Sequence, residues 1–500
     1  MTRPATALLL ALAAPVLLAA GCTLGPDPGQ APATAADAAR WAEAPATGEE
    51  ARALPPDDWW RSFADPVTVD LVETALASNT DVRVAAARVL EAEAALRSAR
   101  GTLYPSVDHG LTGQRNKFSF VLPQVGRVGI YSTTFQQNLS VSYQVDLFGR
   151  LRRTRQAAWA NLVGAEADRK TVVNSLIAQV IRTRAAIAAM ERQLAIDRQT
   201  LESWSTTEDI VEARYGAGVV DAGELYFVRE SRARAAAAIP QLERSLAAAY
   251  HALDVMLGRQ PGTGPRLPDT LPDVPALDPV PVGLPASLLD RRPDLVASRM
   301  QFSAATALVG VALANLYPNL TLTGSAGIVS DDVANLISTD GLIYNVLAGL
   351  VAPIFHGGQL RAEVDAARAR AEAAASRYAG AVLDALREVE DALAAERALG
   401  DQLEWTRRQL EAARGGESLA RWRYDIGTGA ILDLLAADRA LRNSELALTI
   451  TQANLWDVRV GLYLALGGDW ESAAALPPAG DGTTEAPSSG TTPAPAGPRG

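Results

Sequence analysis

Two stretches of this chain, residues 150–213 and 358–422, contain no proline and few glycines. Each run predicts a helix of about 95 Å at about 1.5 Å per residue, which is far longer than one globular core can cover. Apolar residues in both runs recur at alternating steps of four and three, the heptad spacing of coiled-coil packing. In the first run these seam positions, which would face a packing partner, are Leu176, Val180, Thr183, Ile187, Met190 and Leu194. In the second run they are Leu360, Val364, Ala367, Ala371, Ala374 and Tyr378. The chain is therefore expected to pack long helices side by side.

A second periodicity, of two residues, occurs between these helices. Apolar and polar side chains alternate over residues 135–147 and again over 320–328. Such alternation suits a strand of a soluble antiparallel sheet, and it equally suits a membrane barrel with an apolar face toward lipid. In the barrel, Val141, Tyr143 and Leu322 would face lipid, while the lumen would be lined by Ser140, Ser142, Gln144 and Thr323. Two hairpins supply only four strands, and the smallest such barrels have about eight, so a barrel would need several chains.

Three landmarks recur in one order and indicate a duplicated unit. Leu103-Tyr104-Pro105 returns 213 residues later as Leu316-Tyr317-Pro318, and Arg214-Tyr215 with Gly218 returns 209 residues later as Arg423-Tyr424 with Gly427. Leu147-Phe148-Gly149 is echoed 207 residues later by Ile354-Phe355-His356-Gly357. Each unit is predicted to run helix, hairpin, long helix, turn, helix. The first helix is expected over residues 66–100.

The N-terminus reads as a targeting segment. Arg3 precedes an apolar run from Ala5 to Ala20, which ends in Leu18-Ala19-Ala20-Gly21-Cys22 and is similar to a bacterial lipobox. Cys22 would then carry lipid; the alternative is an ordinary cleavage site beside an incidental cysteine. We expect this division: 1–21 signal peptide, 22–58 lipidated linker, 59–258 first repeat, 259–293 proline-rich connector, 294–470 second repeat, 471–500 disordered tail. No later stretch is predicted to be a transmembrane helix, and the best candidate, Ala304 to Leu316, is short.

Composition excludes several classes of protein. A charged fraction of 21% argues against a polytopic helical membrane protein, and a net charge of −11 argues against binding nucleic acid. His109, His251 and His356 are too far apart for metal-ligand spacing, and Cys22 is the only cysteine. Neither a phosphate-binding glycine loop nor a nucleophile elbow is present. We therefore expect no enzymatic activity, no metal and no cofactor.

Five segments together carry a resemblance to a known family. They are Trp59-Trp60 with Phe63 and Pro66, Tyr143 to Arg150, Leu284 to Asp294 with its Arg-Arg-Pro-Asp, Pro353 to Arg361, and Gly461 to Trp470. In this order they resemble the TolC-like outer-membrane factors of tripartite efflux pumps, in the lipoprotein branch. The resemblance implies an α+β membrane protein. Three chains, with four strands each, would form a twelve-stranded outer-membrane β-barrel that continues into a long periplasmic α-helical barrel.

The resemblance also implies a function and partners. The homotrimer would be a passive exit duct for small molecules such as drugs, metals or other toxic compounds. Its partners would be outer-membrane lipid, a periplasmic adaptor and an inner-membrane pump of the resistance–nodulation–division type. Two alternatives remain: an exit channel for type I protein secretion, and a structural coiled-coil lipoprotein without a channel. The alternating strands and the duplication speak against the second.

The two helical turns are expected at the same end of the tube, and in the family acidic residues just after them close the periplasmic tip. By motif this implies gate residues Glu224, Tyr424 and Asp433, of which Tyr424 would link helices through its hydroxyl, with possible support from Asp221 and Asp425. The adaptor-docking tip would include Arg214, Tyr215, Gly218, Arg423 and Gly427. Two departures stand out: Gly429 replaces an arginine link of TolC, and Ala436 replaces a second gate aspartate. A plainer interpretation is that these acids only favour helix N-termini, where carboxylates meet the positive end of the dipole.

Overall fold

The computed structural model describes residues 23–27, 41–42, 59–123, 126–270 and 291–467. Its elements repeat the predicted order twice. The first unit contains a short 3-10 helix η2 (Trp59–Phe63), α2 (Pro66–Ser78), α3 (Thr80–Gly101), β1 (Ser106–Leu122), β2 (Gly126–Val145), α4 (Arg150–Gly216) and α5 (Ala222–Met256). The second contains α7 (Pro293–Ala314), β3 (Asn319–Ser330), η4 (Val333–Ile337), η5 (Thr339–Gly341), β4 (Leu342–Val351), α8 (Gln359–Asp425) and α9 (Ile431–Leu466).

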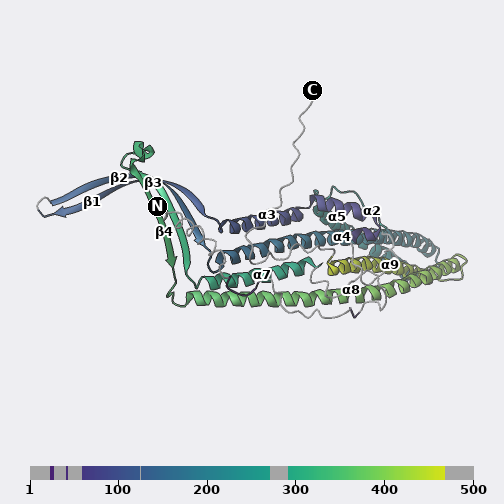
Figure 1. Cartoon of the computed structure of the whole chain (residues 1–500). Helices are drawn as coiled ribbons and strands as arrows, with labels where there is room; N and C mark the ends of the chain where they lie inside the picture. The colour runs from purple at the N-terminus through teal and green to yellow at the C-terminus, as the bar shows by residue number, and fades with distance from the viewer. Residues whose placement is uncertain (1–22, 28–40, 43–58, 124–125, 271–290, 468–500) are drawn as a thin grey trace, which may run out of the picture.

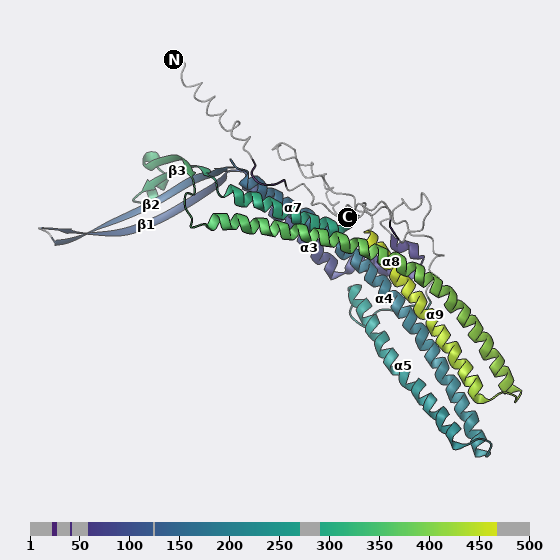
Figure 2. The same cartoon turned by 90° about the horizontal axis from the view of Figure 1, so that it is seen from below.

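The molecule is long, with its strands at one end and its helical turns at the other (Figure 1). The helices α3, α4, α7 and α8 lie beside one another next to the strands (Figure 1). Farther from the strands, α5 and α9 take the places of α3 and α7 against the same two long helices (Figure 2). The long helices α4 and α8 therefore join both halves of the molecule.

The prediction of two very long helices is confirmed. Each of α4 and α8 has 67 residues, or about 100 Å at about 1.5 Å per residue. Most of the predicted seam positions are buried, including Val180 and Ile187 on α4 and Ala367 and Tyr378 on α8. Thr183 and Met190 are half-buried. The heptad pattern thus identified the packed faces correctly.

The strands form one antiparallel sheet in the order β1-β2-β3-β4. Between β2 and β3, Leu139 lies opposite Ala326 and Tyr143 opposite Leu322, while Ser142 lies opposite Thr323. Directly opposite residues share a face of the sheet, so the apolar positions of the two repeats line one face and the polar positions the other. The sheet is open, and β1 and β4 are its edges.

One helix was predicted too long. The expected helix over 66–100 breaks at Asn79, which ends α2 and caps α3: its Oδ1 accepts from the Asp81 and Val82 amides at 2.8 and 3.3 Å. The Asn79 side-chain amide also donates to the Met256 carbonyl at 2.9 Å, at the end of α5. The break is stabilised by a contact with a residue 177 positions away in sequence, which local pattern does not reveal.

The structure also corrects the match between the two strand-to-helix junctions. The residues that precede α4 and α8 are Gly149 and Gly358, both with a positive φ (79° and 86°), and they are 209 residues apart rather than 207. Phe355 therefore stands in the place of Asp146, whose carboxylate accepts from the Leu151 and Arg152 amides at 3.1 and 3.0 Å and caps α4. The Phe355 side chain has no oxygen that could cap α8 in this way.

A short N-terminal segment lies against the first junction. The Leu24 amide donates to the Phe148 carbonyl at 3.3 Å. The Arg153 guanidinium donates to the carbonyls of Leu24 and Gly25 at 3.0 and 3.2 Å. Residues 23–25 are thus held at the boundary between strands and helices. The signal peptide, Cys22, most of the linker, part of the connector and the tail fall outside the described residues.

The helix α7 is the one described helix that is long and apolar enough to cross a membrane, judged by length and composition alone. It begins at Pro293, earlier than the stretch that the sequence singled out, and ends at Ala314. Its most apolar window is 56% buried, with Val296, Ala297 and Ala304 packed on Ala157 and Ala160 of α4. This packing identifies α7 as a core helix.

Candidate functional site: the two helical turns

The first turn joins α4 to α5. Gly218 has a φ of +74°, a conformation that a residue with a side chain rarely adopts. Its amide donates to the Tyr215 carbonyl at 2.9 Å, and the Val219 amide donates to the Arg214 carbonyl at 2.9 Å. This pair of bonds satisfies the last carbonyls of α4 and is the Schellman arrangement of helix ends.

The second turn, between α8 and α9, has the same geometry. Gly427 has a φ of +75°. Its amide donates to the Tyr424 carbonyl at 3.0 Å, and the Thr428 amide donates to the Arg423 carbonyl at 2.9 Å. The repeated Arg-Tyr-x-x-Gly pattern is thus a helix-stop signal, and its arginine is placed where the helix dipole favours a cation.

Both turns lie at the end of the molecule farthest from the strands (Figure 2). A shared apolar cluster holds them there, formed by Trp204, Val211, Leu225, Val228, Ile431 and Leu435. Tyr424 packs against this cluster from the second turn. The expectation that both turns occupy one end is confirmed.

A direct contact joins the two turns. The Arg214 guanidinium lies over the Tyr424 ring, 5.1 Å from its centroid, within range of a cation–π interaction. The Tyr424 hydroxyl is buried and has no hydrogen-bond partner within the described residues. Within one chain, Tyr424 therefore links the turns through its ring rather than through its hydroxyl.

The predicted gate acids lie in the first turns of the returning helices. Asp221 precedes α5, and its Oδ1 accepts from the Glu224 amide at 3.0 Å, so it caps that helix. Asp433 lies in the first turn of α9. Neither the Glu224 nor the Asp433 carboxylate has an ion pair in the part of the chain that the structure describes. The side chain of Asp425, the last residue of α8, falls outside it.

The sequence reasoning missed a charged cluster two turns farther from the tip. Asp438 of α9 is only 5% exposed, and Arg442 of the same helix lies 3.4 Å from its carboxylate. Burial raises the pKa of the Asp438 carboxyl; Arg442 and Arg421 oppose the rise, and Glu417 of α8 adds to it. A signal was available, because Asp438 continues the apolar four–three spacing from Ile431 and Leu435.

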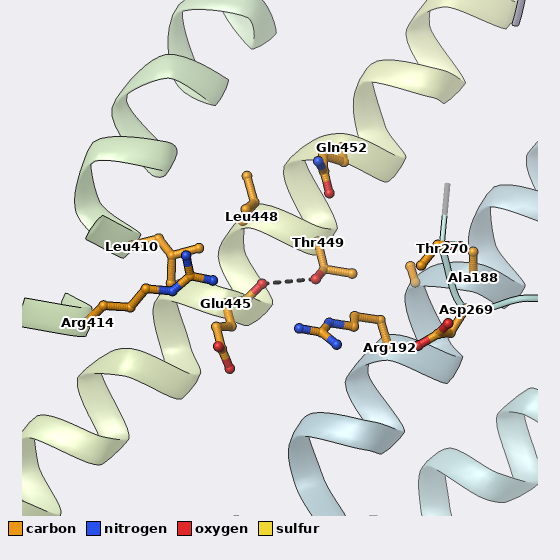
Figure 3. Close-up of a pocket in the computed structure, with 11 residues that line it drawn as sticks. Ala188, Arg192, Asp269, Thr270, Leu410, Arg414, Glu445, Leu448, Thr449 and Gln452 are labelled. Carbon is orange, nitrogen blue, oxygen red and sulfur yellow. Dashed lines mark hydrogen bonds between the residues drawn. The ribbon is translucent and has the colours of Figure 1, made fainter. Parts of the chain in front are cut away.

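A groove between α4, α8 and α9 also lies in this half of the molecule (Figure 3). Arg192 and Arg414 line it together with Asp269 and Glu445, so its positive and negative side chains balance in number. The Thr449 hydroxyl in its wall bonds its own helix, to the Glu445 carbonyl at 2.9 Å. The groove offers no unbalanced charge to a ligand, and the turns remain the stronger candidate site.

Comparison with known proteins decides the family. A model of the family described as outer membrane efflux protein matches residues 71–259 and 284–468, one match in each repeat. The chain belongs to this family. It is 33% identical to the pyoverdine export outer membrane protein OpmQ of Pseudomonas putida, with 85% of this chain and 91% of that protein covered. It is 31% identical to the antibiotic efflux pump outer membrane protein ArpC of Pseudomonas putida, with 92% and 96% covered.

Solved structures of outer-membrane channels are similar to this chain in fold. The outer-membrane channel OprN has 30% identity and a TM-score of 0.78, with 90% of this chain and all of that chain covered. The open state of the Neisseria gonorrhoeae MtrE outer membrane channel has 27% identity and a TM-score of 0.74, with 89% and 98% covered. This outer membrane efflux protein is therefore a channel subunit of a tripartite efflux system, and it works with a periplasmic adaptor and an inner-membrane pump. Three copies of its four-stranded sheet close a twelve-stranded barrel in the outer membrane, and the helices extend into the periplasm.

Proposed function

We propose that the homotrimer is a passive exit duct for small organic molecules, closed at its periplasmic tip by a gate formed from the two helical turns. The gate residues are Glu224, Tyr424 and Asp433, with support from Asp221 and Asp425. The duct performs no chemical reaction of its own. The observation that carries the proposal is the meeting of both turns at one end, where Arg214 covers Tyr424 at 5.1 Å.

The substrate class follows from the relatives. They are named for export of pyoverdine, antibiotics and toluene. These compounds share small size and little else, which fits a wide duct whose pump selects the cargo. The proposal for this chain is therefore a broad class of small organic compounds rather than one ligand.

Two further assignments belong to the same proposal. Cys22 carries lipid that anchors the trimer, which is supported by the packing of the residues that follow it against the Phe148 junction. The adaptor of a resistance–nodulation–division pump docks at the tip residues Arg214, Tyr215, Gly218, Arg423 and Gly427. All five belong to the two helix-stop motifs. Because the two turns have the same geometry, they present equivalent docking surfaces to the adaptor.

The gate is tested by single-channel recording in planar bilayers. Three copies of Glu224 and three of Asp433 would place carboxylates near one axis, where they attract cations and disfavour one another's ionisation. Replacing both with Ala is expected to lower cation selectivity and to raise the closed-state conductance several-fold. A matched control replaces Glu230 and Asp457, which are exposed acids of the same two helices paired with Arg234 and Arg182. Conductance and selectivity that match the wild type in the Glu224/Asp433 variant would refute the gate.

A further inference from the structure

We propose that the contact between the two turns within one chain is repeated between neighbouring chains, so that six arginine–tyrosine contacts encircle the tip of the trimer. The new contact places the Arg423 guanidinium of one subunit over the Tyr215 ring of the next. The inference extends the proposed gate, because it names the contacts that hold the tip together around the whole circumference.

The first step is the equivalence of the two repeats. The two turns have the same φ at their glycines and the same pair of backbone bonds, and Arg214 and Tyr215 correspond to Arg423 and Tyr424 at a spacing of 209 residues. The same spacing separates Gly149 from Gly358 at the other ends of the long helices. The two long helices thus correspond without insertion or deletion from these glycines to the turns.

The second step is the order of the helices. In the half of the molecule that contains the two turns, the helices lie side by side in the order α5, α4, α9, α8. This order follows because α4 contacts both α5 and α9, while α8 contacts α9. In a closed ring of three chains, α8 must therefore meet α5 of the next chain. This contact between α8 and α5 is the counterpart, one repeat farther on, of the contact between α4 and α9.

The third step concerns the arginine and the tyrosine of the two motifs that the contact within the chain does not use. The contact within the chain uses Arg214 and Tyr424. Its counterpart uses Arg423 and Tyr215, the other arginine and the other tyrosine of the same motifs. Tyr215 is 45% exposed, and Arg423 is exposed without an ion pair within the described part of one chain. Both groups are thus available to a second copy.

The apolar side chains around this contact are complementary in size. Inside the chain, Leu435 of α9 belongs to one buried apolar cluster with Trp204 and Val211 of α4. At the equivalent positions α5 presents Tyr226, which is 68% exposed, and α8 presents the small residues Ala413 and Ala420. In the contact within the chain the large aromatic residue, Trp204, is on the long helix. In the proposed contact it is Tyr226, on the returning helix. Such an exchange of volumes preserves close packing, which favours a second copy of this chain as the occupant.

The experiment is photocrosslinking in native outer membranes. Tyr215 is replaced by p-benzoylphenylalanine, which keeps an aromatic ring at that position. Irradiation is expected to give dimers and trimers on a denaturing gel, with crosslinks mapped by mass spectrometry to residues 419–427 of the neighbouring chain. The matched control carries the same probe at Tyr424, which already faces Arg214 of its own chain. That control is expected to crosslink within the chain and to run as a monomer.

Crosslinks from Tyr215 that stay within one chain, or that map away from residues 419–427, would overturn the proposal. The outcome is independent of the gate. Intersubunit crosslinks combined with unchanged conductance of the Glu224/Asp433 variant would support the ring and refute the acidic gate. The variant Tyr215→Leu should raise the closed-state conductance more than Tyr215→Phe, because only phenylalanine keeps the ring face. Equal conductance in these two variants would contradict a contact through the ring.

Discussion

The hairpins α4–α5 and α8–α9 turn back with the same geometry but begin their returning helices differently. Both long helices end in the same pair of backbone bonds around a glycine with positive φ. α5 then starts with Asp221 as a side-chain cap, whereas the equivalent residue before α9 is Ala430, which supplies none. The duplication has thus kept the signal that stops a helix and lost, in one copy, the signal that starts the next.

The ion pairs between the two helices of each hairpin also differ, and again the first hairpin has the stabilising interaction. Arg229 of α5 bridges to Glu208 and Glu212 of α4 at 3.3 and 2.9 Å. The residue equivalent to Arg229 in α9 is Asp438, and the one equivalent to Glu208 in α8 is Glu417, so an attractive pair is replaced by two acids. Arg421 and Arg442 each pair with one of these acids within its own helix, so within the described residues this position near the tip lacks an ion pair between α8 and α9. We therefore expect the tip of the α8–α9 hairpin to move first when the channel opens.

The largest expected effect concerns the feature that the hairpins share. Gly218→Ala and Gly427→Ala should each weaken its own turn by about 1–2 kcal/mol, because a Cβ is disfavoured at positive φ. Hydrogen exchange of the detergent-solubilised trimer, read by mass spectrometry on peptides from each turn, measures this local opening. Gly216→Ala, at a helical glycine of the first motif, is the control and should not weaken the turn. A loss at one turn only would break the equivalence of the two repeats.

The next effect concerns the caps. Asp221→Ala should destabilise the start of α5 by about 1 kcal/mol, and Ala430→Asp should stabilise the start of α9 by a similar amount. The same exchange experiment reports both changes, with opposite signs at the two turns. If Ala430→Asp left α9 unchanged, the missing cap would not explain the difference between the hairpins.

A smaller effect is expected from the exposed ion pairs of the first hairpin. Arg229→Ala should lower the local stability of α5 by about 0.2–1 kcal/mol, the usual range for exposed pairs, and by less at high salt. Arg234→Ala is the control, because within the described residues Arg234 pairs with Glu230 of its own helix and with no acid of α4. Equal losses in the two variants would show that bridging α4 adds nothing to the hairpin.

The smallest effect is on the pH dependence of the second hairpin. The pKa of Asp438 is raised in the folded protein, chiefly by burial. A raised pKa means that the folded state holds the proton more tightly, so this stabilisation is present at low pH and is lost as the pH rises through that pKa. After correction for intrinsic exchange, protection of α9 should fall as the pH rises above about 4, the ordinary pKa of an aspartate. Asp438→Asn should remove this dependence, and a slope that persists in the variant would exclude Asp438 as its source.

Long-range periodicity made most of this fold predictable. The heptad steps located the packed faces of α4 and α8, and the two-residue alternation located the sheet face shared by β2 and β3. Both signals average over many residues, so single exceptions do not erase them. The strand prediction was short, since β2 begins at Gly126 and the earlier residues lack clean alternation.

Features decided by single tertiary contacts were not predictable in this way. The break at Asn79 depends on the Met256 carbonyl, and the ring contact of Arg214 with Tyr424 depends on two turns meeting. The motifs identified Arg214 and Tyr424 as tip residues but did not predict the contact between them. The sequence match of Phe148 with Phe355 does not hold in the structure. Gly149, which precedes α4, directly follows Phe148, whereas Gly358, which precedes α8, lies two residues farther from Phe355.

The packing of residues 23–25 sets the height at which an anchor meets the membrane. Consecutive Cα atoms are about 3.8 Å apart, so acyl chains on Cys22 would leave the protein next to Thr23, which lies against Gly149. The proposed lipid would therefore hold the membrane surface close to the start of α4. Three such anchors in the trimer would resist displacement of the barrel along the membrane normal when an attached pump pulls on the far end.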